Sequence, residues 1–351
     1  MAPKVAIVIL NWNGWKDTIE CLDSVYRISY DPFFVIVIDN GSSDESVLKL
    51  TEYCRGGMAL RNGVAGSGGD VRPSRLVELE RSAAEAGNVP PNVVISPASE
   101  MGLVLILNER NYGFAEGCNI GIRFALSVLD SDYILLLNND TVVDKDLLRE
   151  MVRVGESDER VGIMGPKIYY YDLDGRRDVI WSAGGRISPW RELILFNVGI
   201  GEVDKGQYDV GGETDWCTGA ALLLKKELAK METLNPAYLF GIEDVEYCLN
   251  ARRRGYRVVY VPSAKVWHKV GVSWRKLNKR IGRDISRHFY FIRENFSSAV
   301  YAYHMVLFFA VVLPRWAVTY WSEGSDEKTL LAFVNDMKRL FKYIVSGDLK
   351  G

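Results

Sequence analysis

The chain has 351 residues, of which 48% are hydrophobic and 25% charged, and its formal net charge is −2. This length suits one large globular domain with a smaller appendage, and the near-neutral charge argues against a nucleic-acid binder. Its five cysteines are scattered without a C-x-x-C pair, which fits buried thiols in a reducing compartment better than disulfides or a zinc site.

Apolar runs that suit buried strands alternate with helical segments in the first part of the chain. We expect strands at Val5–Leu10, Phe33–Ile38, Leu103–Leu107 and Tyr133–Leu137, and a helix over Phe114–Leu129. Strands that alternate with helices predict βαβ units and a mostly parallel sheet. Each strand ends in Asn or Asp, so polar groups should gather at one sheet edge. The first apolar run is too short for a signal peptide, so we expect a cytoplasmic protein.

Residues 55–100 differ in character from the segments around them. Repeated glycines and Pro90-Pro91 interrupt any periodicity, and only Leu76–Ala86 has helical spacing. We predict an insertion that contains a flexible loop. A phosphate cradle is the weaker alternative, because no strand directly precedes these glycines and no helix start follows them.

The pattern after Asp140 is mixed. We expect strands at Gly162–Tyr171, Val179–Ile187, Thr214–Lys225 and Tyr256–Val261, and a helix over Glu243–Arg254. From Asp284 onward the chain is predicted to be helical, with a break at Pro314. Ala299–Leu313 is apolar but shorter than the roughly 20 residues that span a bilayer.

Asn138-Asn139-Asp140 points most directly to chemistry. It follows a buried strand and precedes Thr141–Asp144, where a helix can begin. A carboxylate at the carboxyl end of such a strand lies where open α/β sheets bind ligands, and its oxygen suits Mg²⁺ or Mn²⁺ together with substrate phosphates. A helix cap or a surface turn is the plainer explanation. His268 is the candidate second metal ligand, although a lone histidine beside a strand is more often structural.

Other polar residues at strand ends are candidates for contact with a nucleotide. The carboxylate of Asp39 can accept the N3–H of a uracil or thymine ring, and glycines that lead into a helix let a ligand approach the backbone. Simple turn chemistry is the alternative for each, including Asp39 as a cap for Ser42 or Ser43. The predicted nucleotide-binding residues are Asn11, Asn13, Asp39, Asn111, Gly113, Asn119 and Asn139.

Glu243-Asp244 opens a predicted helix and offers a general base. The helix dipole favours carboxylates at this end, which is the plainer explanation. In the functional interpretation Asp244 takes a proton from an acceptor hydroxyl, a contribution worth about 10²–10⁴-fold in rate. Glu243 and Glu246 compete for this role, but they share a helix face while Asp244 points elsewhere.

Residues 252–293 hold 13 Lys or Arg and a single acidic residue, Asp284. Trp267, Trp274 and Phe289 are interleaved with these charges. Such a surface can hold diphosphate oxygens or anionic lipid heads, or it can be an ordinary solvated face. We therefore predict that the helical region 266–351 either lies on a membrane surface or packs on the catalytic domain or on a second subunit as a homodimer.

In order and spacing, seven motifs resemble family 2 glycosyltransferases of the GT-A fold, close to their rhamnosyltransferase-like branch. The resemblance covers about residues 4–295, and although each motif is weak, seven in order are specific. The motifs are Val8–Gly14, Ile38–Asp44, Asn108–Asn119, Leu136–Asp140, Gly219–Leu223, Phe240–Glu246 and Pro262–His268.

The resemblance implies a Rossmann-like α/β catalytic domain over residues 1–265, with helices on both faces of the sheet and a C-terminal helical extension. It implies an inverting, metal-dependent transfer from a UDP- or dTDP-sugar to a hydroxyl of a glycan or lipid-linked acceptor. The basic region 252–293 and the apolar run Ala299–Leu313 add the expectation of a place at the inner face of the membrane. Asp140 becomes the retained carboxylate of the family's Asp-x-Asp motif, whose first position is Asn138 here. Asp39 reads the base and Asp244 is the catalytic base. The acceptor side is assigned to Trp216, Thr218, Gly219 and Glu243.

Three other functions are alternatives to a glycosyltransferase. A sugar nucleotidyltransferase would carry a Gly-rich basic loop after the first strand, and a dehydrogenase would carry G-x-G-x-x-G there. The chain has Asn11-Trp12-Asn13-Gly14 instead. A non-catalytic protein that binds nucleotide sugars or carbohydrate on the same fold stays open as an alternative.

Overall fold

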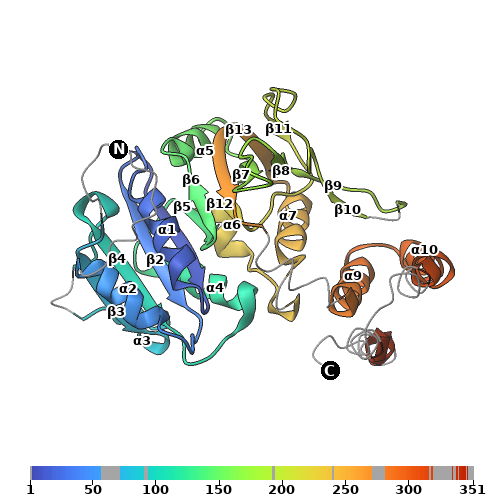
Figure 1. Cartoon of the computed structure of the whole chain (residues 1–351), viewed down its shortest axis with the longest axis horizontal. Coiled ribbons are helices and arrows are strands. Elements are labelled where there is room, and N and C mark those ends of the chain that lie inside the picture. The colour runs from blue at the N-terminus through green and yellow to red at the C-terminus, as the bar shows by residue number, and fades with distance from the viewer. Residues whose placement is uncertain are drawn as a thin grey trace.

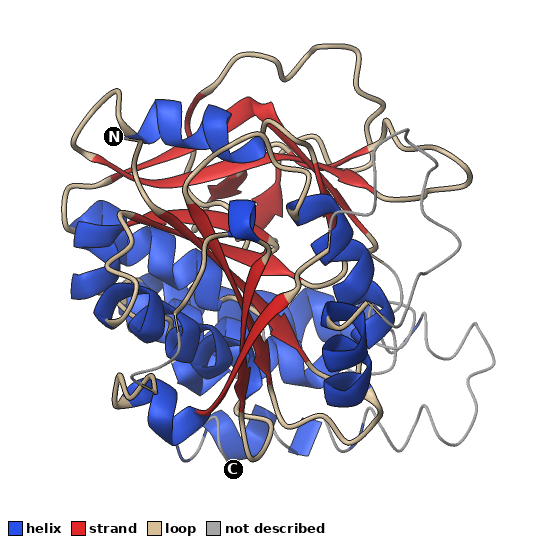
Figure 2. Ribbon diagram, turned by 90° about the vertical axis from the view of Figure 1, so that its left-hand side faces the viewer, coloured by secondary structure: helices blue, strands red, loops and turns tan. Residues whose placement is uncertain are grey.

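The structure is a computed structural model. It describes residues 2–56, 72–90, 94–191, 194–238, 241–270 and 281–315, with residues 318, 334, 337, 338, 340–344 and 346 nearer the C-terminus. Its centre is a mixed sheet with helices packed on both sides (Figures 1 and 2). Residues 57–71 lie outside the described residues, as do Phe240, Trp274 and Leu330, so the expectations that rest on them stay predictions.

Five neighbouring strands of the sheet run parallel. From the edge inward they are β3 (Arg75–Glu80), β4 (Gly102–Leu107), β2 (Phe33–Asp39), β1 (Val5–Asn11) and β5 (Tyr133–Asn138). Strands that are covered on both faces are almost continuously apolar, which explains the sequences of β1 and β5. The register sets Asn11 opposite Asp39, and Leu10 opposite Asn138. The strand-end polar groups therefore meet at one edge, as expected.

Alternate side chains of β1 enter two different cores. Val5, Ile7 and Ile9 face one side of the sheet, and Ala6 and Val8 face the other. The first core is covered by α1 (Trp15–Val25), α2 (Ser46–Cys54) and α5 (Leu147–Gly155). The second is covered by α4 (Gly113–Ser127), α6 (Lys226–Met231) and α7 (Glu243–Arg253). This arrangement confirms the α/β fold with helices on both faces.

The remaining strands extend the sheet beyond β5. β12 (Ala221–Lys225) runs antiparallel between β5 and β7 (Val161–Tyr170), and β13 (Arg257–His268) runs parallel to β7. Short strands pair at the margins: β6 (Thr141–Val143), β8 (Ile180–Ser182) and β11 (Gly212–Glu213). A separate hairpin consists of β9 (Gly185–Ile187) and β10 (Leu195–Asn197).

β13 is longer than the predicted strand Tyr256–Val261, which we expected to end at Pro262. Its pairing with β7 shifts between Val261 and Lys265, and the strand then continues to His268. Residues in a bulge leave the hydrogen-bond ladder, so a proline is tolerated there. Beyond the bulge β13 also pairs with β6, which sets His268 opposite Thr141.

Two helix predictions near the middle of the sequence were wrong. Residues 76–80, the first part of the segment Leu76–Ala86, belong to edge strand β3, and only α3 (Arg81–Glu85) is helical. Val77 and Leu79 are buried with a period of two, which suits a strand with one outward face. After Asp140 the chain forms β6, and the next helix begins only at Leu147. Pairing with β13 favours the extended conformation there.

The C-terminal helices are α9 (Ile281–Asn295) and α10 (Ser298–Leu307). The described helix includes Pro314 and ends at Arg315, and residues 316–317 lie outside the described residues, so the break expected at Pro314 stays a prediction. α10 continues through a π-helical turn, Phe308–Val312, so that Ser298–Arg315 is one helix of 18 residues. Proline lacks an N–H and clashes with the carbonyl four residues earlier, and we attribute its tolerance here to the widened turn before it. By length and composition this helix is apolar enough to cross a membrane, with a mean hydropathy of 1.4.

Near the C-terminus, Leu330, Val334, Met337, Phe341 and Ile344 recur at helical spacing and predict one apolar stripe. Of its described members, Met337 and Ile344 are partly buried in the structure. Leu340 and Tyr343 are the buried residues, and they pack with Phe289 of α9 and Phe308 of the π-helical turn. Phe341, which the stripe places inside, is 54% exposed. The regular spacing predicted an apolar face, but the position of α9 decides which side of the helix is covered.

Candidate active site

Asp140 and His268 form the predicted pair at the end of β5. Nε2 of His268 lies 3.0 Å from Oδ1 of Asp140, and the backbone N–H of Lys269 donates to the carbonyl of Asp140. The ring of Trp181 meets the His268 ring edge-on at 4.8 Å. Burial raises the pKa of Asp140, but its contact and hydrogen bond with His268 bring that pKa below its ordinary value. The carboxylate is therefore ionised at neutral pH.

The chemistry of this pair suits a divalent cation. His268 is buried, and its Nδ1 has no hydrogen-bond partner among the described residues. No cluster of three His, Cys, Asp or Glu side chains occurs in the part of the chain that the structure describes. Mg²⁺ and Mn²⁺ are commonly held by one or two protein ligands with phosphates and water completing the shell, so two ligands are sufficient.

A chain of hydrogen bonds joins the ends of β5, β1 and β2. Nδ2 of Asn139 lies 3.0 Å from Oγ1 of Thr18, whose hydroxyl donates to Oδ1 of Asn11 at 2.8 Å. Nδ2 of Asn11 in turn donates to Oδ1 of Asp39 at 2.7 Å. Thr18 was not singled out in the sequence, because a threonine one turn into a helix gives no signal of this role. The network holds three of the predicted residues in fixed positions.

Asp39 serves as the turn cap that was the plainer alternative. Its carboxylate accepts the hydroxyl of Ser42 at 2.6 Å and the backbone N–H of Ser42 at 2.9 Å, and it is 2% exposed. Asn13 acts in the same turn, where its Oδ1 accepts the backbone N–H of Ser43 at 2.8 Å. The role of Asp39 in reading a base stays a prediction, and it would use the lone pairs that these bonds leave free.

The predicted residues Asn111 and Gly113 lie at the start of α4. Oδ1 of Asn111 accepts the backbone N–H of Gly113 at 2.8 Å and the side-chain amide of Asn40 at 3.0 Å. Asn40 also accepts hydrogen bonds from Asn108 and from the N–H of Tyr112. Asn40 is not among the predicted site residues, although its place directly after β2 is a signal of the same kind. It ties the loop after β4 to the end of β2.

The side chain of Asn119 is engaged by backbone groups, and its predicted contact with a nucleotide stays a prediction. Its side chain donates to the carbonyl of Leu234 at 2.8 Å and accepts the N–H of Leu234 at 3.0 Å. It is 2% exposed. Both ends of the amide are thus occupied by backbone groups, and the residue fastens the segment before α7 to α4.

Asp244 opens α7 and is held by backbone groups. Its Oδ2 accepts the N–H of Gly219 at 2.7 Å and its Oδ1 accepts the N–H of Val245 at 2.8 Å. Burial raises the pKa of Asp244 above its ordinary value, although these two N–H groups lower it. A carboxylate that is held in place and made more basic by burial suits a general base.

The two competing carboxyl groups have different surroundings. Glu243 is 4% exposed and its Oε2 has no partner among the described residues. Burial, and then the charge of Asp244, raise the pKa of Glu243 above its ordinary value. Glu246 accepts hydrogen bonds from Tyr238 at 2.8 Å, Asn235 at 2.8 Å and Asn295 at 3.0 Å. These bonds give Glu246 a structural role.

The predicted acceptor residues divide into two groups. Thr218 and Gly219 lie beside Asp244, and Thr218 hydrogen-bonds to it. Trp216 is 7% exposed and packs so closely on Gly185 that a Cβ there would lie 2.0 Å from its ring. Burial favours a packing role for Trp216, and its contact with an acceptor stays a prediction.

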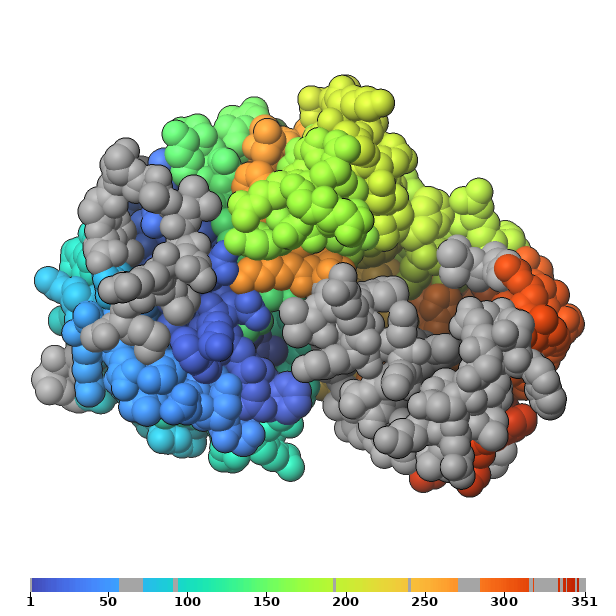
Figure 3. All heavy atoms as spheres, viewed as in Figure 1, coloured from blue at the N-terminus to red at the C-terminus, as the bar shows by residue number. Residues whose placement is uncertain are grey.

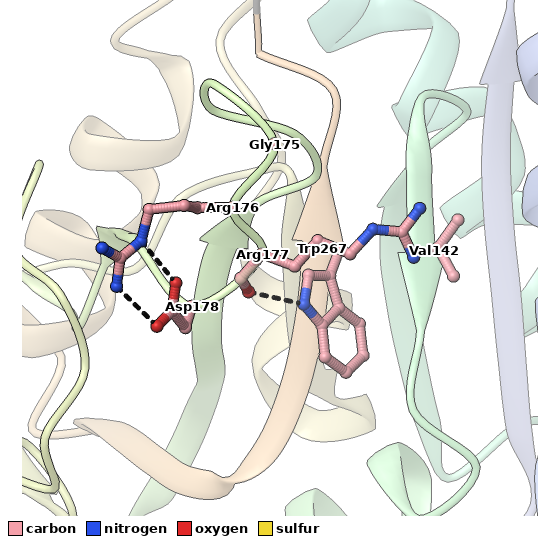
Figure 4. Close-up of a pocket in the computed structure, with 6 residues that line it drawn as sticks. All are labelled: Val142, Gly175, Arg176, Arg177, Asp178 and Trp267. Carbon is pink, nitrogen blue, oxygen red and sulfur yellow. Dashed lines mark hydrogen bonds and ion pairs between the residues drawn. The ribbon is translucent and has the colours of Figure 1, made fainter.

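A separate open cavity of about 580 Å³ lies outside this site (Figure 4). Its lining includes Val142, Trp267 and the turn residues 175–178. The indole N–H of Trp267 donates to the carbonyl of Arg177 at 3.0 Å, and Arg176 pairs with Asp178. Successive residues of a strand face opposite sides of a sheet, so Trp267 points away from the side that His268 faces.

Two family models match the chain. The model described as "Glycosyltransferase like family 2" matches residues 92–286, which is more than half of the chain, and "Glycosyl transferase family 2" matches residues 6–64. The chain belongs to glycosyltransferase family 2. The family that the seven motifs indicated is therefore confirmed.

Two curated relatives are similar over part of the chain. Rhamnosyltransferase WbbL of Escherichia coli (strain K12) is 24% identical over 163 residues, 45% of this chain and 61% of the relative. Low-salt glycan biosynthesis hexosyltransferase Agl10 of Haloferax volcanii is 25% identical over 150 residues, 42% of this chain and 46% of the relative. The matches thus span about half of each relative.

One similar solved structure supports the fold. Mannosyltransferase PcManGT from Pyrobaculum calidifontis, in complex with GDP-Man and Mn²⁺, is 16% identical with a TM-score of 0.54. The alignment covers 97% of this chain and 81% of that protein. At this identity the likeness shows the shared fold alone.

Proposed function

We propose that this chain transfers a sugar from a UDP- or dTDP-sugar to a hydroxyl of a glycan or lipid-linked acceptor, with inversion at the anomeric carbon. The observation that carries the proposal is the contact of Asp140 with His268 at the carboxyl ends of the strands. It gathers ligands for a divalent cation at the edge where the strand-end residues Asn11 and Asp39 also meet. The names of the relatives, a rhamnosyltransferase and a hexosyltransferase, support the same reaction class.

On the donor side, Asp140 and His268 would hold Mg²⁺ or Mn²⁺ together with the diphosphate of the donor. The cation, when bound, neutralises charge that develops on the leaving diphosphate. Asp39, Asn11 and Asn13 would face the nucleoside, and the amino end of α4 at Gly113 would favour negative charge on a phosphate. The solved structure of the similar mannosyltransferase contains GDP-Man and Mn²⁺ together, which is in line with this proposal.

On the acceptor side, Asp244 would take the proton of the acceptor hydroxyl as its oxygen attacks the anomeric carbon. The new carbon–oxygen bond forms on the face opposite the diphosphate, whose bond to the anomeric carbon breaks, so a single displacement inverts the configuration. The N–H groups of Gly219 and Val245 hold the carboxylate of Asp244 in one orientation. Holding base and substrates in line lowers the entropic barrier to this displacement.

We place this reaction in the cytoplasm. The five cysteines are all free and buried, which suits a reducing compartment. Fractionation of cells that express the tagged chain tests the placement, and recovery only from an oxidising compartment would contradict it.

A panel of nucleotide sugars, with and without Mg²⁺ or Mn²⁺, tests the function. A ligand at 100 times its dissociation constant stabilises the fold by about 2.7 kcal/mol, so a donor should raise the melting temperature clearly. Release of nucleotide diphosphate in the presence of an acceptor should follow for the same donor. A chain that binds a nucleotide sugar but never releases its diphosphate would be the non-catalytic alternative, and one that binds none would contradict the proposal.

A further inference from the structure

The outward face of the helix Ser298–Arg315 is apolar along its whole length. The helix is only 17% buried, and no charged side chain occurs between Ser297 and Pro314. Val306 is 67% exposed and Val311 is 37% exposed. A surface helix of a soluble protein normally turns polar residues outward, and a helix that is apolar all round belongs in a core or a membrane. This face is therefore not built for contact with water.

The opposite face of the same helix is attached to the protein. Val300 and His304 are buried, and Nε2 of His304 lies 2.8 Å from the carbonyl of Pro189. Phe308 meets the ring of Phe289 in α9 edge-on at 5.6 Å. A helix that keeps these contacts along its length cannot run perpendicular through a bilayer. It can lie in the interface plane with its apolar side toward the acyl chains.

The hairpin of β9 and β10 adds an aromatic pair beside this helix. Trp190, in the connection between the two strands, is 59% exposed and packs edge-on against Tyr303 at 5.5 Å. The hydroxyl of Tyr303 donates to the carbonyl of Trp190 at 3.0 Å. Figures 1 and 3 show the hairpin and α10 at the same end of the molecule. Trp and Tyr are the residues that favour the membrane–water boundary.

We propose that these elements form one membrane-docking face, made by Trp190, Tyr303, Val306 and Val311, that binds the surface of an anionic bilayer. Exposed Arg191 directly follows Trp190, and exposed Arg315 is the last residue of the helix Ser298–Arg315. Cations beside an apolar face attract anionic lipid heads, which favours a charged bilayer over a second copy of the chain as the occupant. The face combines a C-terminal helix with a hairpin of the catalytic domain, so docking fixes the orientation of both.

The docking face is fixed to the helix that carries the proposed base. Asn295, at the end of α9, donates to Glu246 at 3.0 Å and accepts from Arg253 at 2.7 Å. Both partners lie on α7, which begins at Glu243 and Asp244. Docking would thus hold Asp244 at a set position above the bilayer. This last step rests on the proposed transfer to a lipid-linked acceptor, whereas the docking itself does not.

Vesicle co-sedimentation of the full chain tests the face, with phosphatidylcholine vesicles that contain or lack phosphatidylglycerol. We expect binding that increases with phosphatidylglycerol and falls with salt. Val306→Asp should weaken binding by about tenfold or more, because it places a charge on the apolar face, and Trp190→Ala should weaken it less. Val210→Asp is the matched control, since Val210 is 88% exposed and lies outside the docking face. It should bind like the wild type.

The outcomes separate three conclusions. Equal binding by Val306→Asp and Val210→Asp would overturn the proposal, and so would a wild type that binds no vesicle. A wild-type dimer that Val306→Asp dissociates, measured by light scattering, would assign the face to self-association instead. Calorimetry of UDP and dTDP binding without vesicles is run on every variant. A wild type that binds nucleotide but no vesicle counts against the docking face alone, and a wild type that binds no nucleotide counts against the proposed function.

Discussion

Asp244 and Gly219 are joined by a hydrogen bond of 2.7 Å from the backbone N–H of Gly219 to Oδ2 of the carboxylate. The bond connects the start of α7 with the loop that leads into β12. A carboxylate fixed by backbone groups needs little reorganisation before it accepts a proton. The carboxylate of Asp244 is thus held by a backbone group next to β12 rather than by a mobile side chain.

The first prediction concerns this carboxylate. Asp244→Asn should lower kcat by about 10²–10⁴-fold, because it removes the proton acceptor, while donor affinity stays nearly unchanged. Steady-state kinetics and donor calorimetry measure the two effects. The wild-type rate should fall at acidic pH with a midpoint above the ordinary aspartate value, since burial raises the pKa of Asp244. Loss of turnover in Glu243→Gln or Glu246→Gln, but not in Asp244→Asn, would identify a different base.

The second prediction concerns the metal ligands. Asp140→Ala, or a chelator added to the wild type, should weaken UDP or dTDP binding by at least about tenfold, a loss of about 1.4 kcal/mol. Calorimetry with and without Mn²⁺ measures it. Asn138→Asp, which supplies the missing carboxylate of the Asp-x-Asp motif, should strengthen the part of nucleotide binding that depends on the metal. If wild type, variant and chelated protein bind equally, Asp140 has no metal role.

The third prediction concerns stability and pH. Burial and Asp244 raise the pKa of Glu243 above its ordinary value, so above the ordinary glutamate range the folded state keeps a proton that the unfolded state releases. The free energy of unfolding should then fall as pH rises, by up to about 1.4 kcal/mol per pH unit for this one proton. Glu243→Gln should flatten that decline. Denaturant titrations over a pH series measure it, and identical slopes would mean that Glu243 is ionised in the folded protein.

The fourth prediction separates two roles of Asn119. Asn119→Ala leaves the N–H and carbonyl of Leu234 without their partner, and each unsatisfied buried group costs about 1–3 kcal/mol. The variant should unfold at lower denaturant concentration but bind UDP with wild-type affinity. A large loss of affinity with unchanged stability would support the nucleotide-binding assignment.

The sequence predicted the buried strands well because their physics is local. β1, β2, β4 and β5 are short apolar runs that polar residues end, and few other structures suit them. β3 was missed because Leu76, Val77 and Leu79 fit a helix as well as a one-sided strand. Only pairing with β4 decides between the two, and that contact is not local.

The site residues show the same limit. Asp140 and Asp39 could be singled out because they follow strands, which is a pattern in the sequence itself. The partner of Asn119 is Leu234, 115 residues away, and no spacing predicts it. Glu246 could be separated from Asp244 only after the structure placed Tyr238, Asn235 and Asn295 around it. The hydrogen-bond partners of a side chain depend on tertiary contacts, and a sequence motif does not predict them.

The bulge in β13 determines which side chains of the strand face the site. Because side chains alternate along a strand, the residues between Val261 and Lys265 decide which of two neighbours, Trp267 or His268, is turned toward Asp140. A one-residue slip of the strand after this segment would exchange them, turning the indole of Trp267 toward the carboxylate and the imidazole of His268 toward the open cavity. The length of this segment thus constrains the protein as strictly as the identity of His268 does, and substitutions within it should be tolerated where deletions are not.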